Sequence, residues 1–257
     1  MIMAASAAKR LGVLITFAAA GSLAGCCVRG HVRYPGDGEA SIADDISAET
    51  VALIDVDDEG DTFAFCTGVW VSGDAILTAG HCAAAAARSN AQVNEGVPVE
   101  ARGTNVWYIV QPEVTAVFEA PRARHMALVE SLDEARDVAV LRVVGGVPPH
   151  KVAPLAPAVP AVGEPLHLVG HPRAHYWTYM PGSVAALHDH LKYSSRSGPF
   201  VQVTAPIAPG MSGGGAWDSQ GRLVGIVTTV AKAAPNMGFL VHVDTVRKFL
   251  ADNKVTR

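Results

Sequence analysis

Hydrophobic residues along most of the chain form short β-branched and aliphatic runs, separated by glycine, proline and polar residues. Short runs with such breaks are typical of β-strands. The pattern predicts two series of strands, at residues 51–54, 67–72, 75–78, 106–110 and 138–143, and then at 165–169, 183–187, 200–203, 221–230 and 239–243. Many short strands favour an all-β barrel or sandwich.

A proline-rich segment, residues 145–165, separates the two series of strands. Proline cannot donate to a β-ladder, so we expect this segment to cross between two halves, residues 49–150 and 151–257. The alanine run at 83–87 is expected to form a helical turn. After the last strand, Asp244 is expected to cap a short helix whose apolar residues share one face. Those residues are Val246, Phe249 and Leu250.

Residues 1–25 have the pattern of a signal peptide. Lys9 and Arg10 precede an apolar stretch, residues 11–24, that is too short to span a bilayer comfortably. The stretch ends in Leu-Ala-Gly-Cys, which resembles the lipobox of bacterial lipoproteins. The resemblance implies cleavage before Cys26 and lipidation of its thiol, whereas an ordinary secretory signal is the alternative. Residues 26–48, rich in Gly, Asp and Ser, are expected to be a flexible tether.

The predicted location is the bacterial cell envelope. The residue after Cys26 is Cys27 rather than the aspartate that retains enterobacterial lipoproteins at the inner membrane. The outer membrane, facing the periplasm, is therefore favoured, and the membrane is an expected partner through the lipid anchor. The chain has a net charge of −4 and lacks basic runs, so nucleic acid is not an expected partner.

Two further cysteines, Cys66 and Cys82, are expected to form a disulfide, because an even pair in an exported chain favours one. A metal pair lacks the close Cys and His spacing of zinc sites. Five histidines in the second half also match no such spacing, so neither a metal nor a cofactor is expected. They are His167, His171, His175, His188 and His190.

Three separate motifs carry candidate chemistry. TAGHC (78–82) places His81 after a strand, DVAVL (137–141) places Asp137 at the start of one, and PGMSGG (209–214) places Ser212 in a glycine-rich turn. A serine hydroxyl needs a base to attack a carbonyl, and histidine serves near neutral pH. A buried carboxylate fixes the imidazole tautomer. These residues form a candidate catalytic triad.

Two details of this site complete the prediction. Gly210 lets the backbone bend so that its own N–H group and that of Ser212 converge on one oxyanion. Asp137 is the preferred carboxylate, and Asp133 or Asp189 would replace it if the chain threads differently.

TAGHC, DVAVL and PGMSGG resemble the His, Asp and Ser motifs of trypsin-like serine peptidases, in that family's chain order. The resemblance spans residues 50–250 and is strongest to the bacterial HtrA-like and glutamyl-endopeptidase-like branch. It implies two six-stranded antiparallel β-barrels, a short C-terminal helix and endopeptidase activity on proteins or peptides through an acyl-enzyme. Cys66 and Cys82 resemble the family's disulfide at the His loop. No PDZ domain is expected after the terminal helix.

Two positions depart from the digestive trypsins. Met211 stands where they carry an aspartate that pairs with a new N-terminus, so activation by that route is not expected. Pro206 stands where trypsin has the aspartate that selects Lys or Arg, so a small or medium apolar side chain is the expected preference. A strand is expected to pair with the substrate backbone. Its residues are Thr228, Thr229 and Val230.

Two other functions remain open. A catalytically silent relative would bind peptides in the same groove, and the sequence does not show whether the oxyanion turn is properly formed. The second alternative is an esterase or another acyl-transfer enzyme. The α/β-hydrolases use G-x-S-x-G with the chain order Ser, Asp, His, which is the reverse of the order here. The silent peptide-binding relative is therefore the main alternative.

Overall fold

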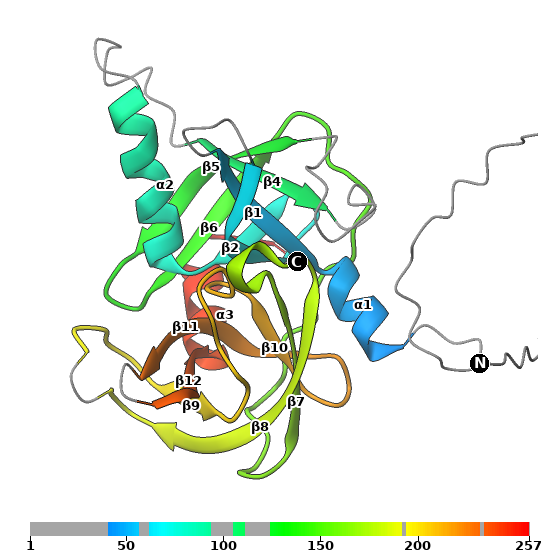
Figure 1. The fold of residues 1–257 in the computed structure, drawn as a ribbon, viewed down its shortest axis with the longest axis vertical. Helices are drawn as coiled ribbons and strands as arrows, with labels where there is room; N and C mark the ends of the chain where they lie inside the picture. The colour runs from blue at the N-terminus through cyan, green and yellow to red at the C-terminus, as the bar shows by residue number, and fades with distance from the viewer. Residues whose placement is uncertain are drawn as a thin grey trace, which may run out of the picture. The chain divides into compact units, whose positions relative to one another are not determined.

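The computed structural model describes residues 41–56, 62–93, 105–110, 124–191, 194–231 and 234–256. These residues form two closed, six-stranded antiparallel β-barrels, which confirms the predicted fold class (Figure 1). The predicted signal peptide, Cys26 and residues 26–40 of the predicted tether lie outside the described residues. Within the described ranges, no helix is long and apolar enough to cross a membrane.

The first barrel closes in the order β1-β2-β3-β6-β5-β4. Its strands are β1 (Thr50–Val56), β2 (Thr62–Trp70), β3 (Ala75–Thr78), β4 (Asn105–Val110), β5 (His125–Asp133) and β6 (Val138–Val144). Aliphatic and aromatic side chains fill the interior, since alternate residues of each strand face inward. Fully buried examples are Val51, Leu53, Trp70, Tyr108 and Leu141.

The second barrel closes in the order β10-β11-β12-β9-β8-β7. Its strands are β7 (Pro165–Gly170), β8 (Thr178–His188), β9 (Phe200–Val203), β10 (Gly215–Trp217), β11 (Leu223–Ala231) and β12 (Ala234–His242). The segment between the barrels bonds to both, since Ala153 N–H donates to Trp70 and Ala156 N–H to Leu223. It therefore acts as the crossover that its prolines predicted.

Two strands were not anticipated from the sequence. β5 (HMALVESLD) has apolar residues at 126–129 and 132, and from Ala127 onward less exposed residues alternate with exposed ones. β10 has three residues and directly follows the glycine-rich turn. Both are held by pairing with neighbours on either side, which a local pattern does not record.

Helices occur at both ends of the described chain and beside the first barrel. The helices are α1 (Ile42–Ala48), α2 (Gly80–Val93), the 3-10 turn η3 (Pro172–Ala174) and α3 (Val243–Asp252). Helix α3 contacts β6 of the first barrel and β11 and β12 of the second (Figure 1).

Three of these helices correct the sequence-based picture. Residues 42–48 were expected in a flexible tether but form α1, because Ser41 and Asp44 make a capping box and Ile46 is fully buried. Helix α2 extends well beyond the single turn expected at 83–87. Helix α3 is capped by His242 rather than Asp244, since His242 Nδ1 accepts from the Asp244 N–H at 3.1 Å.

Candidate active site

His81 lies in the first turn of α2, where that helix leaves the end of β3. A small residue suits the position before it, because a Cβ at Gly80 would make a tight contact, 3.0 Å, with the backbone nitrogen of Val138. This close packing brings the start of α2 against the start of β6. The His81 side chain is 38% exposed, so its ring reaches solvent.

Asp137 lies at the start of β6 and is 1% exposed. Its φ of 58° is left-handed, a conformation that aspartate tolerates better than most residues. The Oδ1 atom accepts from the His81 backbone N–H at 2.8 Å and lies 2.9 Å from His81 Nδ1. The carboxylate therefore fixes both the backbone and the ring of His81.

Two side chains from the second half of the chain also bind Asp137. The Thr228 hydroxyl donates to Oδ2, and Arg196 Nε lies 3.1 Å from the same oxygen. Arg196 Nη2 lies 3.2 Å from His81 Nδ1. Burial alone would raise the pKa of Asp137, but the hydrogen bonds and charges of these groups outweigh it and hold the pKa below its ordinary value.

Sequence reasoning missed the role of Arg196, which lies between β8 and β9, far from every motif. Only the closure of the second barrel brings it to His81. The side chain of Thr228, a residue predicted to pair with the substrate backbone, is buried against Asp137. Of the other carboxylates, Asp133 pairs with Arg136 at 2.5 Å, and Asp189 is exposed on a cavity wall.

Ser212 is partly exposed in the turn before β10. Its carbonyl oxygen accepts from Thr67 N–H at 2.8 Å and lies 3.7 Å from the Cys82 sulfur. Because Cys82 follows His81 directly, the turn lies beside the start of α2. No hydrogen bond joins Ser212 Oγ to His81 within the described residues. Catalytic hydrogen bonds in unliganded enzymes commonly tighten only when substrate binds.

The turn around Ser212 leaves two backbone donors unused. Gly210 has a φ of 96°, and a Cβ there would overlap the carbonyl oxygen of His171. Met211 N–H donates to Ala208 at 3.1 Å, and Gly213 N–H donates to Val227 at 2.8 Å. Among described residues, none accepts from the N–H groups of Gly210 or Ser212. Two free donors two residues apart are what an oxyanion site requires.

Cys66 and Cys82 form the predicted disulfide, with their Cα atoms 6.2 Å apart. It joins β2 to the first turn of α2. Within the described part of the chain, the group of three potential metal ligands consists of these two cysteines and His81. Both sulfurs are bonded to each other, so this group does not offer a metal site in the oxidised chain.

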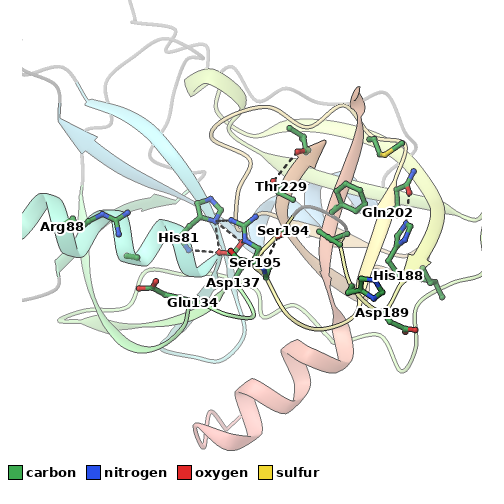
Figure 2. Close-up of a pocket in the computed structure, with 18 residues that line it drawn as sticks. His81, Arg88, Glu134, Asp137, His188, Asp189, Ser194, Ser195, Gln202 and Thr229 are labelled. Atoms are coloured by element: carbon green, nitrogen blue, oxygen red, sulfur yellow. Dashed lines mark hydrogen bonds and ion pairs between the residues drawn. The ribbon is translucent and has the colours of Figure 1, made fainter. Parts of the chain in front are cut away.

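A cavity of about 1300 Å³ opens beside His81 and Asp137 (Figure 2). Thr229 and Val230 line one wall. The pairing of β11 with β10 ends at Ile226, so Thr229 and Val230 lie on the part of β11 that extends beyond β10.

The predicted pocket residue Pro206 is exposed and does not line this cavity. Its neighbour Ile207 packs tightly over Gly238, where a Cβ would overlap the Ile207 side chain.

A family model described as a trypsin-like peptidase domain matches residues 66–226. The chain belongs to this family. The three motifs all lie within the matched range. The expectation of a serine-type, trypsin-like peptidase domain is thus confirmed at the level of the family.

Curated and solved proteins agree with this trypsin-like assignment. "Protease Do-like 1, chloroplastic" of Arabidopsis thaliana is 34% identical over 129 residues, which is 47% of this chain and 29% of that protein. The Rv3671c protease of M. tuberculosis, in its active form, matches with a TM-score of 0.61 and 20% identity over 84% of this chain and 85% of that one. The HtrA-type protease AlgW with a tripeptide matches with a TM-score of 0.60 and 20% identity, over 82% of this chain and 62% of that one. At these identities, the solved structures show a shared fold.

Proposed function

We propose that the chain is a serine endopeptidase in which Ser212 is the nucleophile, His81 the general base and Asp137 the residue that orients His81. The observation that carries the proposal is the 2.9 Å contact between His81 Nδ1 and the buried carboxylate of Asp137. An anionic carboxylate accepts the Nδ1–H proton, which leaves Nε2 unprotonated and able to act as a base.

The reaction proceeds in two halves. The Ser212 hydroxyl gives its proton to His81 Nε2 as Oγ bonds to the substrate carbonyl carbon, and the carbonyl oxygen becomes an oxyanion held by the free N–H groups of Gly210 and Ser212. The C–N bond then breaks and His81 protonates the leaving amine. Water repeats the sequence on the acyl-enzyme, giving its proton to His81, which returns one to Ser212 as the acid leaves. No step needs a metal or cofactor.

The proposal is tested by labelling and turnover. A fluorophosphonate probe should label the wild type but not S212A, and casein cleavage should fall by at least about 10³-fold in S212A. The main alternative is a silent peptide-binding relative. Folded wild-type protein that binds peptides but neither labels nor cleaves would replace the endopeptidase proposal with that alternative.

We further propose a preference for small or medium apolar P1 side chains. Support comes from Pro206, which stands where trypsin has its selective aspartate, and from Ile207 packed over Gly238. In a peptide library, cleavage after Ala or Val should exceed cleavage after Lys or Arg. A dominant signal after Glu, Lys or Arg would contradict this preference while leaving the catalytic proposal intact.

We also propose export to the cell envelope and lipidation of Cys26. The support is the Leu-Ala-Gly-Cys segment at residues 23–26, together with the Cys66–Cys82 disulfide, which suits an oxidising compartment. Radiolabelled palmitate should enter the wild type and the matched control C27S but not C26S. Equal incorporation in C26S would assign the lipid elsewhere.

A further inference from the structure

The oxyanion turn is held by four hydrogen bonds to consecutive carbonyl groups. Pro209 O accepts from Arg173 N–H at 2.7 Å, and Met211 O accepts from Gly214 N–H at 2.9 Å. These two carbonyls belong to the same peptide units as the N–H groups of Gly210 and Ser212. Since C=O and N–H point in opposite directions in a trans peptide, each bond directs one free N–H group away from the residue that donates to the carbonyl of the same peptide unit.

The other two carbonyls of the turn are held by one residue of the first barrel, Thr67. Its hydroxyl donates to Gly210 O at 2.7 Å, and its backbone N–H donates to Ser212 O at 2.8 Å. Thr67 thus binds the carbonyl group of each of the two donor residues, Gly210 and Ser212. Among the described residues, Thr67 supplies the hydrogen bonds that join these carbonyls to the first barrel.

Thr67 is itself rigidly placed. It is fully buried in β2, and its carbonyl oxygen accepts from the Thr78 hydroxyl at 2.7 Å. A Cβ at Gly213 would overlap both this oxygen and the Thr78 hydroxyl, so the turn packs directly onto the two threonines. The preceding residue, Cys66, is bonded to Cys82, the neighbour of His81. One short stretch of β2 therefore anchors both the turn and the His81 segment.

We propose that Thr67 is a positioning residue that orients the oxyanion donors through its hydroxyl, an inference that rests on the proposed endopeptidase function. Met211 precedes the nucleophile and is a fully buried apolar residue, so no ion pair at that position holds the turn. The hydroxyl of Thr67 replaces such an anchor with a neutral hydrogen bond across the barrel junction. Because the donors act on the oxyanion, the effect belongs to the transition state rather than to substrate binding.

The test compares T67S, T67A and T67V in the full-length protein, with a peptide amide substrate. T67S and T67A lose the same methyl group and differ by one hydroxyl. We expect T67A and T67V to lower kcat by about 10-fold or more with KM nearly unchanged, and T67S to stay close to the wild type. The affinity for a peptide boronate, which places an oxygen in the same site, should fall together with kcat/KM.

T50V is the matched control. The buried Thr50 hydroxyl donates to Ile46 O at 2.7 Å, at the end of α1 and away from the turn. T50V should lower the urea midpoint but leave kcat unchanged. Equal kcat values for T67S and T67A would overturn the role of Thr67, and so would a kcat loss in T50V as large as that in T67A at a comparable fall of the urea midpoint. Wild-type protein that neither cleaves nor labels would refute the proposed function itself, and this inference with it.

Discussion

At the scale of single residues, the site depends on how buried polar groups are satisfied. Asp137 is almost fully buried, yet four groups from two barrels bind its carboxylate. His171 is buried to a similar degree and accepts the Trp177 N–H at Nδ1, at 2.9 Å. Buried charges and acceptors with such partners are tolerated, whereas those without them are costly. Substitution of Asp137 should impair catalysis, whereas acid should lower the stability of the fold through His171.

Replacing Asp137 with asparagine tests its orienting role. Asparagine keeps the shape and tolerates left-handed backbone, but it does not hold His81 in the tautomer with an unprotonated Nε2. D137N should fold and lower kcat by about 10⁴-fold. The control D133N alters a partly buried carboxylate, 18% exposed, that pairs with the exposed Arg136, and it should keep kcat within about two-fold of the wild type. Full activity in D137N would exclude Asp137 from the triad.

Acid should destabilise the fold through His171. Burial lowers the pKa of His171 from 6.5 to about 3. Below pH 6.5 the unfolded chain binds a proton that the folded chain does not, so unfolding becomes easier as pH falls. This contribution is about 1.4 kcal/mol per pH unit until the folded chain is also protonated near pH 3.

Urea unfolding at a series of pH values checks this. H171N retains a side-chain acceptor for the Trp177 N–H and should show a shallower loss of stability between pH 6.5 and 4. The exposed histidine His175 provides the control, and H175N should keep the wild-type slope. Identical slopes in H171N and the wild type would show that His171 is not responsible.

At the scale of elements, β2 and α2 act together. The disulfide joins them across a sequence separation of 16 residues. β2 contacts the oxyanion turn through Thr67, while α2 begins at the residue before His81. Glycines at 210 and 213 allow backbones to approach where a Cβ would collide, and Gly80 allows an approach where a Cβ would make a tight contact. The motifs are therefore sites of close packing between elements as well as sites of chemistry.

Removing the disulfide should affect stability more than chemistry. C66A/C82A should lower the free energy of unfolding by about 3 kcal/mol, because the unfolded chain gains entropy when the loop opens. Urea denaturation with and without reductant measures the change. Reductant should destabilise the wild type and leave the double variant unaffected. A wild type insensitive to reductant under unfolding conditions would contradict this prediction.

At the scale of the whole described chain, the site is assembled across the junction of two barrels. The segment between β8 and β9 reaches the first barrel, where Ser197 N–H donates to Ala135 O at 2.7 Å and Arg196 reaches Asp137. Thr67 makes the reciprocal contact, from the first barrel to the turn of the second. Relative movement of the barrels would therefore disturb the base and the oxyanion donors together.

Substitution of Arg196 should show how much its ion pair with Asp137 stabilises this junction. Its side chain is 22% exposed and its partner 1% exposed, so R196Q should lower the free energy of unfolding by about 1–3 kcal/mol. The control R136Q breaks a pair whose arginine is 48% exposed, and it should have little effect. Urea unfolding of both variants measures the difference. Equal effects would mean that Arg196 contributes no more than a surface charge.

Much of the fold was predictable because strands and crossovers depend largely on the residue types within their own segments. Apolar runs indicated most of the strands, and prolines indicated the crossover. β5 was missed because its short apolar run at 126–129 is followed by the polar Glu130 and Ser131, and β10 because three residues are too few to show a period. Helix α1 was missed although its capping residues, Ser41 and Asp44, are visible in the sequence, because the burial of Ile46 that also stabilises it depends on the tertiary fold.

By itself, the sequence determined the two-half β architecture, the order of the three motifs and the turn in which glycine is required. Only the tertiary structure decided which carboxylate faces His81, and that Thr67, Thr228 and Arg196 support the site. Arg196 lies 115 positions from His81, and Thr67 lies 143 from Gly210. The reason is physical: backbone preferences act over a few residues, whereas hydrogen bonds across a barrel junction exist only after both barrels have closed.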